Sequence, residues 1–192
     1  MAHSRSRPGS AAQTARTDRS GRRATTLRRL WANPAGRFLV RYPFFTALVF
    51  LVPVFLPGSE RVMILATLHS LGVARFVLHA PVRVAEPFFS IGQTSIQIVA
   101  DCTAMFPTLL LMGAILAFPA RWRSKLVGAL AGIALMWAYN LIRIYTLMLV
   151  LRYAPGYFDL VHVYLWQSVT LLVVLGVFVL WARVSEAEGA PA

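Results

Sequence analysis

One apolar stretch of this chain reads LVGALAGIALMWAYNLIRIYTLMLVL and occupies residues 126–151. A membrane-spanning helix needs about 20 consecutive, mostly apolar residues, so this stretch is long enough to cross a bilayer without help. It carries a single charged side chain, Arg143. The stretch therefore predicts a membrane protein rather than a soluble domain.

Three further apolar stretches extend this prediction along the chain, at residues 44–56, 103–118 and 161–181. The last is long enough to span by itself, whereas the first two are short for a span. The whole chain of 192 residues is 58% hydrophobic, with a mean hydropathy of +0.64, and a soluble domain is nearer 45–50% apolar. We therefore expect an all-α polytopic membrane protein, a helical bundle of about four transmembrane helices.

The distribution of positive charge predicts how these spans are oriented. Three basic residues fall within residues 121–125, between the second and third stretches, and Arg183 closes the fourth. Lys and Arg concentrate in cytoplasmic loops, so both regions and the Arg-rich N-terminal segment are expected inside. Residues 57–101 and 152–160 then face outward, and both termini are cytoplasmic.

Residues 1–37 differ in composition from the rest of the chain. Ten of the 19 Lys and Arg residues lie in the first 41 positions, together with one acid, Asp18. The segment is rich in Ser, Thr, Gly and Arg and lacks apolar periodicity, which predicts a disordered basic cytoplasmic tail. Such a tail beside a span favours binding to anionic lipid, so the formal net charge of +12 does not predict a nucleic-acid partner. The expected domains are this tail, a transmembrane domain at residues 38–184 and a short cytoplasmic tail at 185–192.

The outer segment, residues 57–101, has a mixed pattern. Residues 60–71 predict a short helix lying at the membrane interface. Apolar residues then alternate over positions 75–84, which predicts a strand, and residues 95–99 are expected to pair with it as a hairpin, with Gly92 near the turn. This small extracytoplasmic segment would precede the second span.

A competing interpretation places a fifth span over residues 62–78. It would contain two polar side chains, His69 and Arg75, and it would force a sixth crossing to keep the basic loops inside. This alternative stays open beside the scheme of four spans.

Three polar residues from separate apolar stretches fall at one predicted depth. Arg143 lies 18 residues beyond Lys125, which is about 27 Å along a helix and close to the far side of a hydrocarbon core about 30 Å thick. Cys102 begins the second stretch and His162 begins the fourth, each at its outer end. A charged residue in a span marks a functional site by default, although a buried thiol, a snorkelling arginine and an interfacial histidine are ordinary alternatives.

The flanking residues add chemical detail to this group. Asp101 is expected to cap the second span and Asp159 the fourth. Cys102 would then lie in the first turn of its helix, where the positive end of the helix dipole favours a thiolate.

The other side chains of the group suit acyl transfer. His162 can accept the thiol proton and return it to a leaving amine, and Arg143 can stabilise a thiolate or an oxyanion with its five donors. Asn140 lies three residues before Arg143 on the same helical face, where it can orient Arg143 or a substrate carbonyl.

Four motifs resemble the exosortase/archaeosortase family, most closely the exosortase H type. They are Asp101-Cys102-Thr103, LAFPARWR at 116–123, NLIRI at 140–144 and FDLVHVYLWQ at 158–167. The similarity covers residues 57–181, and the order Cys, Asn-x-x-Arg and His on successive helices is its most specific feature. The family usually has Gly two residues after the Cys, where this chain has Ala104, whose methyl group is expected to narrow the approach of the substrate.

The resemblance implies an activity and a location. Family members are membrane cysteine transpeptidases that cleave a C-terminal sorting signal of exported proteins, made of a short PEP-CTERM-like motif, a transmembrane helix and a basic tail. Carried over to this chain, it implies Cys102 as nucleophile, Arg143 as stabiliser and His162 as general acid and base. We also expect Asn140 and Thr103 to bind substrate. It also implies the bacterial inner membrane, with the active site facing the periplasm.

A second function remains open beside the enzyme. A non-catalytic membrane subunit for assembly or export of an envelope polymer would use Arg143 and His162 to bind an anionic lipid. A transporter is less suited, because paired broken helices are not evident. Neither a metal nor an organic cofactor is implied: the single cysteine rules out a Cys-based zinc site and an internal disulfide, and the histidines lack ligand spacing, at His3, His69, His79 and His162.

Overall fold

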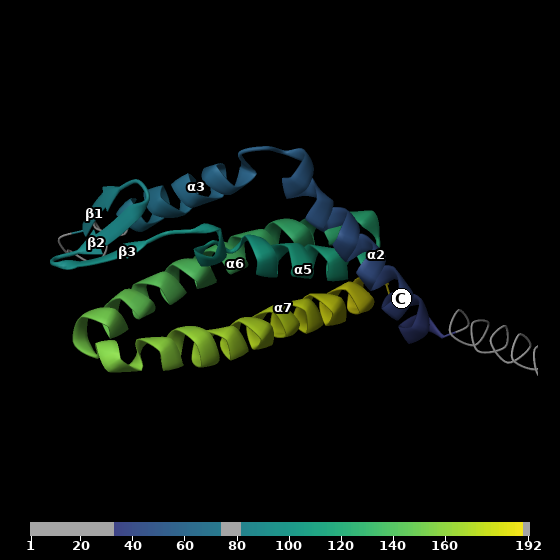
Figure 1. Cartoon of the computed structure of the whole chain (residues 1–192). Coiled ribbons are helices and arrows are strands. Elements are labelled where there is room, and N and C mark those ends of the chain that lie inside the picture. The colour runs from purple at the N-terminus through teal and green to yellow at the C-terminus, as the bar shows by residue number, and fades with distance from the viewer. Residues whose placement is uncertain (1–32, 74–81, 190–192) are drawn as a thin grey trace, which may run out of the picture. The chain divides into compact units, whose positions relative to one another are not determined.

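A computed structural model describes residues 33–73 and 82–189 of the chain (Figure 1). The chain divides into two compact units, Met1–Arg41 and Tyr42–Ala192. Most of the predicted basic tail therefore lies outside the described residues, and so does most of the predicted strand that begins at residue 75.

The described part of the first unit is the start of helix α2, Pro34–Phe55. Asn33 caps this helix, because its Oδ1 accepts a hydrogen bond of 3.1 Å from the N–H of Ala35, and proline suits the first helical position. The helix thus begins a few residues before the boundary predicted at residue 38.

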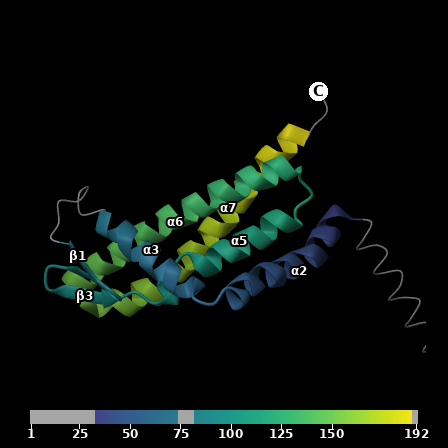
Figure 2. The ribbon, with the colours of Figure 1, turned by 90° about the horizontal axis from the view of Figure 1, so that it is seen from above.

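The second unit is mainly helical (Figures 1 and 2). Besides the rest of α2, its longer helices are α3 (Ser59–Val73), α5 (Met105–Ala117), α6 (Trp122–Tyr153) and α7 (Trp166–Gly189). Three short turns complete it: 3₁₀ turns at Ala100–Cys102 and Pro155–Tyr157, and a π-helical turn at Leu160–Leu165. The helix predicted at residues 60–71 is thus present as α3, and α7 runs on into the residues assigned to a C-terminal tail.

Three helices of the described chain are long and apolar enough to cross a membrane: Ala35–Phe55, Trp122–Tyr153 and Leu160–Glu186. The expectation of a helical membrane protein is confirmed at this level. Helix α5 is apolar but has only 13 residues, about 20 Å of rise, so four complete spans are not established. Helix α3, at 15 residues, is not among the three, and the rest of the proposed fifth span, residues 74–78, lies outside the described residues.

A three-stranded antiparallel sheet replaces the predicted hairpin. Strands β1 (Val82–Ala85), β2 (Phe88–Ile91) and β3 (Thr94–Gln97) pair in the order β1-β2-β3. For residues 82–84, the described part of the predicted strand, the expected pairing with residues 95–99 is wrong, because β2 lies between β1 and β3 and buries Phe89 and Ile91 in the core. Gly92 does lie in the β2–β3 turn, where its φ of +64° suits glycine.

A core cluster beneath the sheet joins α3, β2 and the second half of α6. Its fully buried members include Leu68, Leu71, Phe89 and Met148. The ring of Phe89 meets that of Tyr145 edge to face at 5.5 Å, and the Tyr145 hydroxyl donates a hydrogen bond to the carbonyl of Leu71. The sheet is thereby attached to α6, which sets the position of the chain that leaves β3.

A second cluster packs α5, α6 and α7 together, and these helices lie side by side in both views (Figures 1 and 2). Phe118, at the end of α5, contacts Trp181 of α7 with ring centres 5.6 Å apart. A Cβ at Gly128 of α6 would overlap the Trp181 indole, so glycine gives that ring its place. Lys125 Nζ donates to the carbonyl of Leu116 at 2.6 Å. This bond holds the basic start of α6 against the end of α5.

Candidate functional site

Cys102 lies at the end of the 3₁₀ turn that connects β3 to α5. The Cys102 N–H donates to the carbonyl of Val99 at 2.9 Å. The Thr103 hydroxyl donates to the carbonyl of Ala100 at 2.7 Å, and the chain at Thr103 is extended, with φ −88° and ψ 162°. These contacts present Cys102 on a short, fixed loop rather than on a helix.

The predicted cap of this helix is wrong. The N-cap position of α5 is Ala104, and no side chain caps the helix there. Asp101 belongs to the preceding 3₁₀ turn, and the extended residue Thr103 separates that turn from α5. Cys102 is therefore not in the first turn of α5, and the dipole argument for a thiolate does not apply as predicted.

Asn140 of α6 holds the Cys102 loop in place. Its side chain is 4% exposed, and its Nδ2 donates a 2.8 Å hydrogen bond to the backbone carbonyl of Cys102. The amide was expected to orient Arg143 or a substrate carbonyl, and the structure shows one of its two Nδ2 hydrogens bonded to the loop. No local signal in the sequence predicts this contact, because the two residues are 38 positions apart.

Arg143 follows Asn140 by almost one helical turn, on the same face of α6. Its Nε is buried and has no hydrogen-bond partner among the described residues. A buried donor without a partner costs about 1–3 kcal/mol, so this N–H is available to donate a hydrogen bond to an oxygen atom of a bound molecule.

His162 lies in the π-helical turn Leu160–Leu165. Its ring packs against that of Phe158, with centres 5.4 Å apart and planes at 31°. The predicted cap by Asp159 is wrong, because Asp159 already has helical angles (φ −65°, ψ −39°) and makes no capping bond, whereas an N-cap residue is normally extended. The helix is entered through the 3₁₀ turn Pro155–Tyr157 instead.

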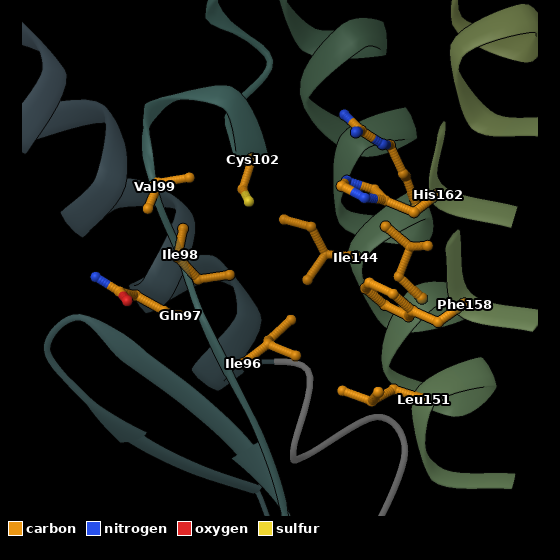
Figure 3. Close-up of a pocket in the computed structure, with 11 residues that line it drawn as sticks. Ile96, Gln97, Ile98, Val99, Cys102, Ile144, Leu151, Phe158 and His162 are labelled. Atoms are coloured by element: carbon orange, nitrogen blue, oxygen red, sulfur yellow. The ribbon is translucent and has the colours of Figure 1, made fainter. Parts of the chain in front are cut away.

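One cavity of about 390 Å³ is lined by Cys102, Arg143 and His162 together. Figure 3 shows Cys102 on the loop wall and His162 on the opposite, helical wall. The structure thus brings together the three residues that the sequence placed at one depth, while their chemical roles stay predictions. The remaining wall is mostly apolar and comprises Ile96, Gln97, Ile98, Val99, Ile144, Leu147, Leu151 and Phe158.

A second cavity, of about 610 Å³, lies beside the first and shares Arg143 and His162 with it. Thr103 lines this second cavity, and Asn140 lines neither of the two. Ala104 also lines neither, because it is buried in the cluster of α5 and α6. Its methyl group is therefore not part of either cavity wall, and its effect on the approach of a substrate stays a prediction.

Sequence reasoning missed the strand residues of the first cavity and also Phe158. The spacing of four residues between Phe158 and His162 is a helical signal that predicts contact. Among the described residues, no group of three or more His, Cys, Asp and Glu side chains is arranged to hold a metal ion. The cavity therefore offers a thiol, an imidazole and a guanidinium as its reactive groups.

Comparison of the chain with protein-family models, with curated proteins and with solved structures found no match. The resemblance to the exosortase/archaeosortase family thus rests on the motif residues themselves.

Proposed function

We propose that this protein is an exosortase-type cysteine transpeptidase, which cleaves a C-terminal sorting signal of exported proteins. The observation that carries the proposal is the first cavity, where Cys102, Arg143 and His162 meet from three separate segments. The buried Nε of Arg143, which has no hydrogen-bond partner in residues 33–73 and 82–189, adds to it, because acyl transfer needs a donor for a developing oxyanion.

The proposed reaction has two steps, the formation of a thioester at Cys102 and its cleavage by an acceptor. His162 takes the proton of the Cys102 thiol, and the sulfur attacks the scissile carbonyl carbon while Arg143 donates to the oxygen that becomes negative. A C–S bond forms and the C–N bond breaks, and His162 passes the proton to the leaving amine. An acceptor amine, or water, then attacks the thioester, loses its proton to His162 and releases Cys102 as a thiol.

The membrane arrangement in the proposal has four crossings. Helix α5 would make the second of them together with its flanking residues, which places both termini in the cytoplasm and the cavity on the periplasmic side of a bacterial inner membrane. The partner is the sorting signal of the substrate, with its short motif, transmembrane helix and basic tail. The basic residues 1–37 would bind anionic lipid headgroups.

The test compares Cys102→Ser, Arg143→Lys and a matched control, Thr146→Ala. Thr146 lies almost one turn beyond Arg143 on α6, and within the described part of the chain its hydroxyl donates to the carbonyl of Ile142 in its own helix. Cells produce each variant at equal level together with an exported protein that carries the C-terminal signal. Mass spectrometry of the new C-terminus reports processing.

Cys102→Ser should abolish processing, because a hydroxyl is far harder to ionise than a thiol of similar size. Arg143→Lys should reduce it by about 10²-fold or more, the usual cost of one oxyanion donor, since an ammonium cannot replace a planar fork. Thr146→Ala should process normally. If Cys102→Ser works at a near wild-type rate, the enzyme is excluded and the lipid-binding membrane subunit becomes the better account.

A further inference from the structure

Strand β3 is an edge of the sheet. It pairs with β2 on one side, and no strand pairs with its other side in the described part of the chain. An open edge carries a row of backbone donors and acceptors that suits the addition of another extended chain.

The register shows which backbone groups face the open edge. The N–H of Ile98 donates to the carbonyl of Pro87, toward β2, at 2.9 Å. In an antiparallel ladder, alternate residues bond to the same neighbour, so Thr94 and Ile96 also bond toward β2. The N–H and C=O groups of Ser95 and Gln97 therefore point to the open edge.

This edge leads directly into the first cavity. The side chain of Gln97 points away from Cys102 and His162 in Figure 3, yet Gln97 lines the cavity, so its backbone forms part of the wall. From Gln97 the chain continues through Ile98 and Val99 into the turn that ends at Cys102. A chain laid along β3 would thus be guided toward the thiol.

We infer that the substrate binds as an extended peptide added to β3 as a fourth strand. Its backbone pairs with Ser95 and Gln97, its scissile carbonyl reaches Cys102, and one apolar side chain enters the cavity beside Ile98, Ile144 and Phe158. Backbone pairing supplies affinity in such complexes, and the pocket supplies specificity. This inference rests on the proposed function and adds how the substrate is held.

The sheet has a second open edge that provides a matched control. Among the described residues, strand β1 pairs with β2 alone, in the register Val82↔Ile91, Arg83↔Ser90, Val84↔Phe89 and Ala85↔Phe88. The backbone N–H and C=O of Phe89 bond toward β3, so Phe89 and its partner Val84 form a pair without hydrogen bonds between β2 and β1. The N–H of Val84 therefore points to the outer edge of β1. Proline is tolerated where a strand N–H faces outward, so Gln97→Pro and Val84→Pro each remove one edge donor.

The experiment measures alkylation of Cys102 in the full chain in lipid nanodiscs, and Cys102 is the single cysteine of the sequence. The peptide probe is acetyl-Ala-Val-Ala chloromethyl ketone. Two further probes are this peptide with an N-methyl group on one amide or on the next amide, so that each lacks one backbone donor. Chloroacetamide is the control reagent, because it has no peptide backbone to pair with β3. The proteins are wild type, Gln97→Pro and the matched control Val84→Pro. Mass spectrometry gives the second-order rate constants.

Gln97→Pro should slow the peptide probe roughly three- to tenfold, the effect of one hydrogen bond, and leave chloroacetamide unchanged. Val84→Pro should react like wild type. One of the two N-methylated probes should be slowed by a similar factor on wild type. The inference is overturned if Gln97→Pro and Val84→Pro react equally with the peptide probe, or if both methylated probes react like the parent.

Two results separate this inference from the proposed function. A change in the rate at which chloroacetamide alkylates Gln97→Pro indicates a disturbed fold. The rates of the methylated probes on the wild-type protein then decide whether the peptide pairs with β3. If chloroacetamide labels wild type no faster than Arg143→Ala, the activated-thiol site itself fails, whatever the β3 edge does.

Discussion

Asn140 connects the helix that carries Arg143 to the loop that carries Cys102. Its 2.8 Å bond to the Cys102 carbonyl is made in a nearly closed environment, where the amide is 4% exposed. A buried carbonyl that loses its donor is left unpaired, which is costly. Asn140 is therefore a positioning residue in the proposed site, distinct from the groups that line the cavity.

We expect Asn140→Leu to lower the free energy of unfolding by about 1–3 kcal/mol and to slow alkylation of Cys102 by chloroacetamide. Thermal unfolding and mass spectrometry measure the two effects. Tyr139→Phe is the control, because it removes a 2.8 Å hydrogen bond to Thr170 between α6 and α7 without touching the loop. It should alter stability alone. An Asn140→Leu variant that is alkylated at the wild-type rate would refute the positioning role.

At the scale of elements, the π-helical turn Leu160–Leu165 decides where His162 points. It lies between the 3₁₀ turn Pro155–Tyr157 and α7. A π turn holds one residue more than an α turn, so it rotates everything before it by about 100° relative to the helix that follows. Such turns are frequent at functional sites, and this one sets the direction of His162 relative to α7.

Deleting Val163, which is exposed, should convert this turn to regular α-helix and turn His162 away from the cavity. Processing of the tailed substrate should fall by about 10²-fold or more, the scale expected for misplaced reacting groups. Helix content by circular dichroism should be kept. Val163→Ala retains the turn and should process normally. Normal processing by the deletion variant would show that the π turn is not needed.

At the scale of the whole second unit, the cavity and the basic loop lie at opposite ends of the bundle. Lys125 contacts the last turn of α5, and Ser124 shares a 2.7 Å hydrogen bond with Ser185 near the end of α7. Cys102 precedes α5 and His162 precedes α7. If the bundle crosses a membrane, the thiol and the basic loop therefore face opposite sides.

Cysteine accessibility in a Cys102→Ser background tests this topology. An impermeant maleimide added to intact cells should label Gly156→Cys but leave Arg123→Cys and Ser10→Cys unlabelled, because basic segments stay inside. Permeabilised cells should show labelling at all three positions. Labelling of Arg123→Cys in intact cells would refute the orientation, and labelling of Ser10→Cys would show three crossings instead of four.

Much of the helical framework was predictable from the sequence. The stretch at 126–151 lies within α6, and the stretch at 161–181 lies within the helical segment Leu160–Glu186. A run of about 20 apolar residues is a local property, so it needs no knowledge of the rest of the fold. The shared depth of Cys102, Arg143 and His162 followed from the same helical rise.

Only the tertiary structure decided how these elements meet. The short β2 became the central strand because Phe89 packs against Tyr145, a contact between distant parts of the chain. Contacts between distant segments also explain the bond from Asn140 to the Cys102 loop. They explain as well why neither Asp101 nor Asp159 caps a helix. Cap and turn geometry depends on which distant groups satisfy the backbone, and that information does not lie in any local stretch of residues.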